Sequence, residues 1–98
     1  MAKHILQVAP KSAKVVFEND LIRVIEITLK KGQKVGMHSH SKGLSYGLNK
    51  SKYRSTGTDG KSKVVKVKKG SAMWGEGDSH AVENLGGKSK MLSIELKS

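Results

Sequence analysis

The sequence has 98 residues, 36% hydrophobic residues and a net charge of +11. A chain of this length buries one core, so we expect one domain over residues 1–98, with residues 1–13 as an N-terminal extension. The absence of cysteine excludes disulfides and thiolate metal ligands. The first residues lack the apolar run of a signal peptide, and no stretch approaches the about 18 apolar residues of a membrane span. We therefore expect a cytoplasmic protein without a membrane segment.

The excess of positive charge raises the question of a nucleic-acid or anionic-surface partner. All but two of the 19 basic residues are lysine, whereas base readout and bidentate phosphate binding favour arginine. The densest lysine stretch, residues 61–69, contains no aromatic residue for base stacking. We therefore predict a solvated lysine surface rather than a nucleic-acid site. Lys61 and Lys63 are expected to point outward and to protect a sheet edge from pairing.

Strand signals recur along the chain, and no clear helical periodicity is present. Antiparallel strands in this number must close or stack to hide their edges. The prediction is an all-β fold, a small antiparallel β-barrel or double-sheet jelly roll, with a mouth where distant residues can meet. The expected strands cover residues 15–18, 21–29, 35–40, 44–48, 52–56, 62–68, 71–74, 80–85 and 90–96.

Three of the four histidines lie in two of these expected strands. His38 and His40 are two positions apart, so they point to the same face of a strand, which also carries Gly36. His80 comes from a distant strand and could complete a three-imidazole site for a divalent metal ion. The alternatives are two ordinary histidines at the barrel mouth and a hydrogen-bonded core histidine at position 80. His4 lies in an expected unstructured start and is not counted as a ligand.

The two histidine segments resemble the paired motifs of the cupin superfamily. The resemblance covers residues from about 15 to 96, and it implies a β-barrel whose metal ligands come from both motifs. The matching residues are Gly32, His38 and His40 in the first motif and Gly77, His80 and Asn84 in the second.

The chain departs from the first motif at its glutamate, because Leu44 and Ser45 occupy the expected positions. The implied ligand set is therefore three histidines. Cupins without this glutamate include three-histidine iron dioxygenases, small single-domain cupins with no assigned reaction, and cupins that bind no metal; the sequence is most similar to the small single-domain group. Without the carboxylate, Fe, Ni or Zn is favoured over Mn. An anionic ligand could then provide the missing negative donor.

Several other residues are candidates for the same site. Tyr46 could place a phenol near the metal as a proton donor or substrate anchor, or it could be a core or rim aromatic residue. Trp74 is expected in core packing or in the pocket lining. Asn84 is expected to fix the local turn or a ligand histidine. Glu26 is a distant candidate to replace the missing carboxylate.

The sequence therefore favours a small metal-binding cupin that acts on a small anionic metabolite, by dioxygenase-like or Lewis-acid chemistry. The alternative is a non-catalytic module that binds or senses a metabolite, and the sequence leaves open whether the protein is an enzyme. A basic nucleic-acid or anionic-surface binder is the least favoured class. Open sheet edges, together with the resemblance, imply a homodimer.

Overall fold

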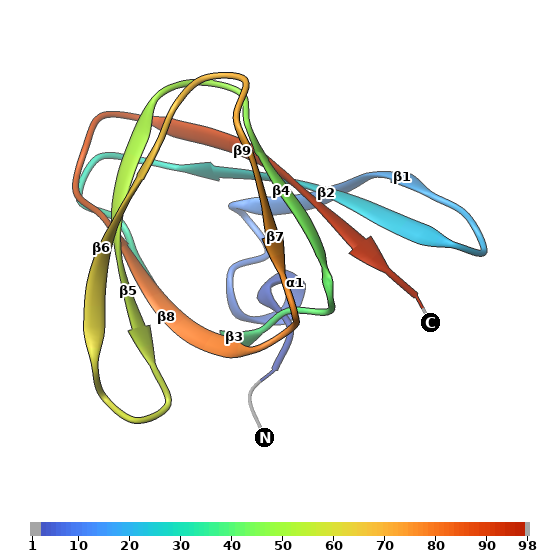
Figure 1. The fold of residues 1–98 in the computed structure, drawn as a ribbon, viewed down its shortest axis with the longest axis horizontal. Coiled ribbons are helices and arrows are strands. Elements are labelled where there is room, and N and C mark those ends of the chain that lie inside the picture. The colour runs from blue at the N-terminus through green and yellow to red at the C-terminus, as the bar shows by residue number, and fades with distance from the viewer. Residues whose placement is uncertain (1–2, 98) are drawn as a thin grey trace.

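The computed structural model describes residues 3–97, which form two β-sheets facing each other in a small barrel (Figure 1). All nine expected strands are present, and their ends differ from the expected ones by no more than two residues. This confirms the all-β jelly-roll prediction. The elements are α1 (Ile5–Val8), β1 (Ala13–Glu18), β2 (Ile22–Leu29), β3 (Lys34–Ser39), β4 (Gly43–Gly47), β5 (Ser51–Gly57), β6 (Ser62–Val67), β7 (Ala72–Gly75), β8 (Ser79–Asn84) and β9 (Ser89–Leu96).

The strand order brings distant parts of the chain together. One sheet has the order β1-β2-β9-β4-β7 and the other β3-β8-β5-β6, and the strand pairs are antiparallel. The pairing of β3 with β8 joins the two segments that contain His38, His40 and His80. A search for membrane-crossing helices within residues 3–97 finds none that is sufficiently long and apolar.

Alternation along β2 separates the core from the surface. Ile25, Ile27 and Leu29 are buried and form much of the core. Glu26 points to the opposite face, where its carboxylate lies 3.8 Å from the Lys14 ammonium. The proposal that Glu26 replaces the missing carboxylate is therefore wrong, because the pleat of β2 directs its side chain away from the barrel interior.

The N-terminal segment is described from Lys3 onward and contains α1, while residues 1–2 of the expected extension lie outside the described residues. Ile5 is buried in the core. The His4 ring caps α1, since Nδ1 accepts a hydrogen bond from the Leu6 amide at 3.1 Å. The proton of a neutral His4 ring is then on Nε2, which lies 2.9 Å from both oxygens of buried Glu95. The expectation of an unstructured start was wrong. The helix α1 is too short to give a periodic pattern in the sequence, and it is held in place by the contact of His4 with Glu95 on β9, which is distant in the chain.

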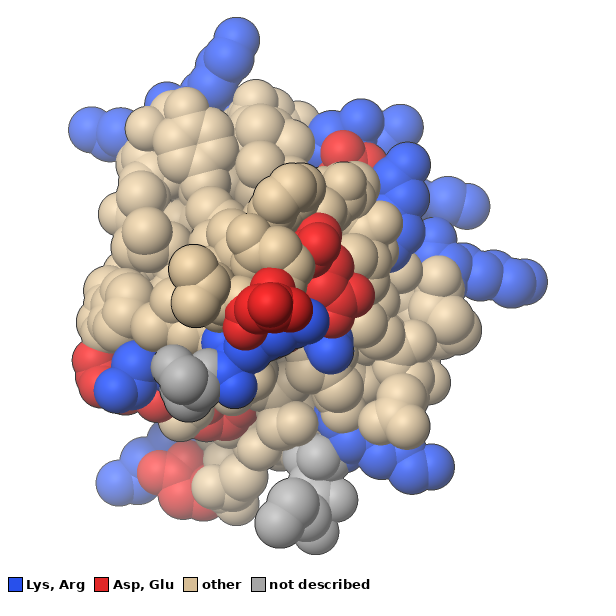
Figure 2. All heavy atoms as spheres, turned by 90° about the vertical axis from the view of Figure 1, so that its right-hand side faces the viewer, with Lys and Arg blue, Asp and Glu red and all other residues tan. Residues whose placement is uncertain are grey.

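The lysines are dispersed over the surface. Figure 2 shows basic side chains around the margin of one face, separated by uncharged surface. The dense lysine stretch belongs mainly to β6, which is an edge strand of its sheet, as expected for protection against pairing. Lys63 departs from the outward orientation expected for it, because it lines the interior cavity together with Val65.

The contact of β4 with β9 provides a test of the fold. A Cβ atom at Gly43 would lie 2.0 Å from the carbonyl oxygen of Ile94, which belongs to the neighbouring backbone and cannot move aside. Overpacking typically costs about 1–3 kcal/mol. We expect Gly43→Ala to lower the free energy of unfolding, measured by urea denaturation, by this amount or more. Gly87→Ala is the control, since a Cβ there meets nothing within 4 Å. Equal stability of Gly43→Ala and wild type would contradict this close approach.

Candidate metal centre

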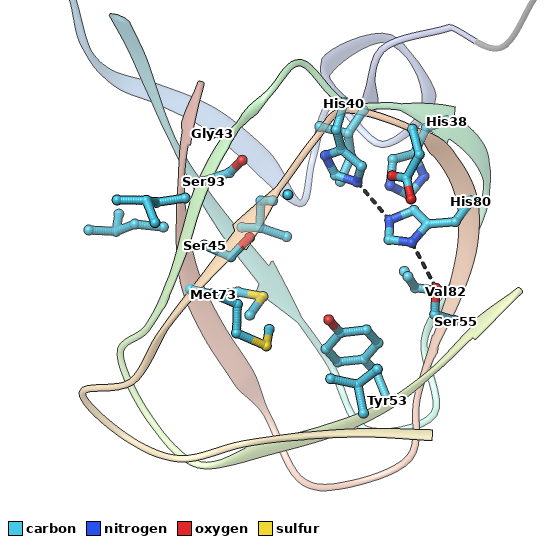
Figure 3. Close-up of a pocket in the computed structure, with 18 of the residues that line it drawn as sticks. His38, His40, Gly43, Ser45, Tyr53, Ser55, Met73, His80, Val82 and Ser93 are labelled. Atoms are coloured by element: carbon cyan, nitrogen blue, oxygen red, sulfur yellow. Dashed lines mark hydrogen bonds between the residues drawn. The ribbon is translucent and has the colours of Figure 1, made fainter. Parts of the chain in front are cut away.

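A cavity of about 290 Å³ lies between the two sheets (Figure 3). Its walls are mostly apolar, with the side chains of Ile27, Leu29, Val82 and Met91 among them, and serine hydroxyls supply part of the polar surface. Within residues 3–97, the charged side chains that line it are those of Lys63 and Asp78. The interior therefore suits an uncharged portion of a small ligand, while charge is confined to a few positions.

The three histidines gather at one end of this cavity. Figure 3 shows the rings of His38, His40 and His80 side by side. Their ring centroids are 4.6 to 4.9 Å apart, and the ring planes meet at 66 to 80°. One nitrogen from each ring lies within 4.8 Å of the others, and the Nε2 atoms of His40 and His80 are 2.6 Å apart. The three histidines are thus close enough to hold a metal ion, which imidazoles bind at about 2.0–2.1 Å.

A β-bulge turns His38 into the barrel. Val35 pairs with Val82 and His38 pairs with His80, so β3 contains one residue more than β8 over this stretch. Val35 and His38 are both buried although they are three positions apart, while Gly36 and Met37 are exposed. The expectation that simple alternation places His38 on the face of Gly36 was therefore wrong. The bulge re-aims the side chain, as bulges near functional sites commonly do.

Hydrogen bonds and burial prepare the rings for metal binding. The Nδ1–H of His38 donates to the Gly36 carbonyl at 2.8 Å, which leaves the lone pair on Nε2. Nδ1 of His80 lies 2.8 Å from the Ser55 hydroxyl, which can fix the same tautomer. Burial lowers the pKa of His38 and of His80, and burial with the neighbouring imidazoles lowers the pKa of His40 to about 3. The rings are therefore neutral near pH 7, which is the form that binds metal ions.

Gly77 holds the loop before His80 against the loop after His40. Its φ of +91° is a left-handed conformation, and a Cβ would lie 3.1 Å from the Lys42 nitrogen and 3.2 Å from the His40 oxygen. The His40 amide donates to the Asp78 carbonyl at 2.8 Å across the same contact. The glycine of the second motif thus permits the close approach that brings His40 toward His80.

The structure does not bring Tyr46 to the histidines. Tyr46 is outside the cavity lining, its ring is exposed, and its hydroxyl lies beside Gly70. The phenol that faces the cavity belongs to Tyr53, on β5 (Figure 3). Burial, together with the charge of Asp78, raises the pKa of Tyr53, so its hydroxyl keeps its proton. Sequence patterning missed Tyr53 because no motif marks it, and only the closure of the barrel turns β5 toward the histidines.

Of the two residues expected to support the site, Asn84 lies at the turn after β8 and Trp74 lies at the cavity. Asn84 is buried, and its side-chain amide donates to the carbonyls of Leu29, Lys30 and Gly87. It therefore fixes the turn after β8 rather than a ligand histidine. Trp74 lines the cavity with 52% of its surface exposed, and its indole N–H donates to Glu76. Of its two expected places, the structure supports pocket lining.

Comparison with solved structures shows the fold. The chain is similar to a cupin domain from Bordetella pertussis, with a TM-score of 0.80 and 22% identity over 88% of this chain and 92% of that one. It is also similar to a cupin superfamily protein from Desulfitobacterium hafniense, with a TM-score of 0.66 and 17% identity over 88% of this chain and 76% of that one. For KdgF from Halomonas sp., the TM-score is 0.62 at 13% identity, over 88% of this chain and 79% of that one.

The fold is that of a small cupin domain, and one ring nitrogen each of His38, His40 and His80 lie close enough together to hold a metal ion. No family model matches the sequence, and no curated protein matches it significantly. The similarity to solved structures therefore identifies the cupin fold, while activity must be inferred from the site itself.

Proposed function

We propose that this protein holds one divalent metal ion on His38, His40 and His80 and acts on a small anionic organic molecule in the barrel cavity. The observation that carries the proposal is the convergence of three neutral imidazoles, two of them held by hydrogen bonds at Nδ1, on a mostly apolar cavity. With three histidine ligands, an ion here keeps open coordination positions and supplies Lewis acidity, or dioxygen chemistry when the ion is iron.

The other cavity residues support binding of such a molecule. Lys63 lines the cavity and supplies a positive charge, which also contributes to lowering the pKa of His80. The protonated Tyr53 hydroxyl can donate a hydrogen bond to a ligand oxygen, and the apolar walls exclude water around it. Leu44 and Ser45, which stand at the positions of the absent glutamate, both line the cavity and leave it without a carboxylate on that side.

Metal analysis tests the central claim. Protein purified without a chelating tag is expected to take up about one Fe, Ni, Zn or Mn ion per chain, measured by mass spectrometry after incubation with each metal. His38→Ala with His40→Ala should abolish uptake, because two of the three imidazoles are removed. Gly87→Ala is the control, since a Cβ there meets nothing within 4 Å and Gly87 lies outside the cluster. Uptake that persists in the double variant, or is absent from wild type, would refute the site.

Ligand screening tests the anionic substrate class. Small carboxylates and sugar acids should raise the melting temperature of the metal-loaded protein, and uncharged analogues should raise it less. Tyr53→Phe should weaken the best ligand about threefold to tenfold, the loss of one hydrogen bond, when measured by calorimetry. Tyr46→Phe should leave its affinity unchanged, because Tyr46 lies outside the cavity. Equal affinity in Tyr53→Phe and wild type would contradict the role of this phenol.

Turnover of the bound ligand distinguishes the enzyme from a non-catalytic binding module. A ligand that is stabilised in the barrel but recovered unchanged, with and without dioxygen and with each metal, would favour the binding or sensor function. Conversion that is lost in the double histidine variant would favour the enzyme. Both outcomes keep the metal site and differ only in whether the bound molecule is changed.

We also propose a homodimer formed by the edge strand β1. Three consecutive side chains of this strand, Val15, Val16 and Phe17, are 42 to 52% exposed, and no strand among residues 3–97 pairs with the outer edge of β1. A second β1 can pair with this edge antiparallel about a two-fold axis and cover these side chains.

Light scattering tests the dimer. It should give twice the chain mass for wild type, and Val16→Lys should give a monomer. Val64→Lys, at an exposed valine of β6, is the control expected to remain a dimer. A monomeric wild type would refute the pairing.

A further inference from the structure

The register of β3 and β8 places four side chains in two adjacent cross-strand positions. His38 pairs with His80, and Ser39 pairs with Ser79. His40 directly follows β3 and Asp78 directly precedes β8, and the His40 amide donates to the Asp78 carbonyl at 2.8 Å. Residues two apart along an extended chain share a face, so Asp78 is expected on the face of His80, next to His38 and His40. The imidazole cluster therefore has a carboxylate residue beside it.

Asp78 is directed to the same cavity as the cluster. Within residues 3–97 it is the one carboxylate residue that lines the cavity, and no ion pair or side-chain hydrogen bond there engages its carboxylate. Its negative charge raises the pKa of His38 and His80, against the larger lowering effect of burial, and adds to the effect of burial in raising the pKa of Tyr53. Its side chain is exposed at the mouth and follows Gly77, so rotation about the side-chain bonds meets little resistance.

The other nearby carboxylates are already engaged. Glu95 is buried against His4 on both of its oxygens. Glu76 accepts from the Trp74 indole and lies 4.0 Å from the Lys42 ammonium. Asp59 accepts from the backbone amide of Lys61 at 2.9 Å and so caps its own turn. Asp78 is therefore the carboxylate that remains free to approach the histidines.

We propose that Asp78 is the fourth side chain of the metal centre and supplies, from the second motif strand, the carboxylate that the first motif lacks. This inference rests on the proposed metal site. Asp78 is not within the 4.8 Å cluster in the present rotamer, so it would join the ion by a side-chain rotation. The resulting set of three imidazoles and one carboxylate has a harder donor and a lower net charge than three imidazoles alone. Such a set binds Mn²⁺ and Fe²⁺ better, relative to Ni²⁺, than an all-imidazole set.

Calorimetric titration with Mn²⁺ and Ni²⁺ tests the role of Asp78. Asp78→Asn should weaken Mn²⁺ binding by at least about tenfold and weaken Ni²⁺ binding less, because the carboxylate matters most for the harder ion. Asp78→Glu should keep most of the Mn²⁺ affinity, since it preserves the carboxylate. Urea denaturation of each metal-free variant should match wild type, because the Asp78 side chain has no partner to lose.

The matched control is Glu76→Gln, which removes one negative charge from the same loop. It should leave both affinities unchanged, so an effect of Asp78→Asn cannot come from net charge alone. Equal loss of Mn²⁺ affinity in the two variants, or no loss in Asp78→Asn, would overturn the inference and leave the three-histidine site intact. A wild-type protein that binds neither ion would instead overturn the proposed metal site and this inference with it.

Discussion

The candidate site depends on one structural feature, the antiparallel pairing of β3 with β8. This pairing joins two segments about forty residues apart and sets His38 directly opposite His80. The extra residue in β3 then decides which face His38 occupies. Without the bulge, the burial of Val35 would place His38 on the outer face by alternation, and the three rings could not meet. The arrangement of the three rings therefore depends on the register of β3 and β8 as well as on the presence of the histidines.

Desolvation gives the cluster its chemical character. Three imidazoles packed edge to edge cannot all be charged in a buried site, and the pKa of each is lowered accordingly. Two rings have a fixed partner at Nδ1, in Gly36 and Ser55. The N-terminal segment also supports this arrangement: the Ser39 amide donates to the Lys3 carbonyl, and Glu95 accepts from both His4 and the Ser41 amide. These contacts hold the backbone on both sides of His40.

Local patterns in the sequence predicted the strands and the three histidines, because period-two alternation, turn residues and the two motifs are short-range signals. They did not predict the bulge at Gly36 and Met37, since an extra residue in one strand is defined only relative to its partner strand. They also left open whether Tyr46 lies near the metal or at the core or rim, and they overlooked Tyr53, because both tyrosines lie on plausible strands and only barrel closure decides which phenol faces inward. The partnership of His4 with Glu95 joins the two ends of the chain, so no local signal could show it.

The distribution of charge separates the outside of this protein from its interior. Most of the +11 net charge lies on dispersed, exposed lysines, and these act on a ligand only through a screened long-range field. Lys63 and Asp78 differ from them because both line the cavity and both change the pKa of His80, in opposite directions. The cavity therefore carries one positive and one negative side chain of its own, both at its exposed margin, in addition to the lysines dispersed over the outer surface.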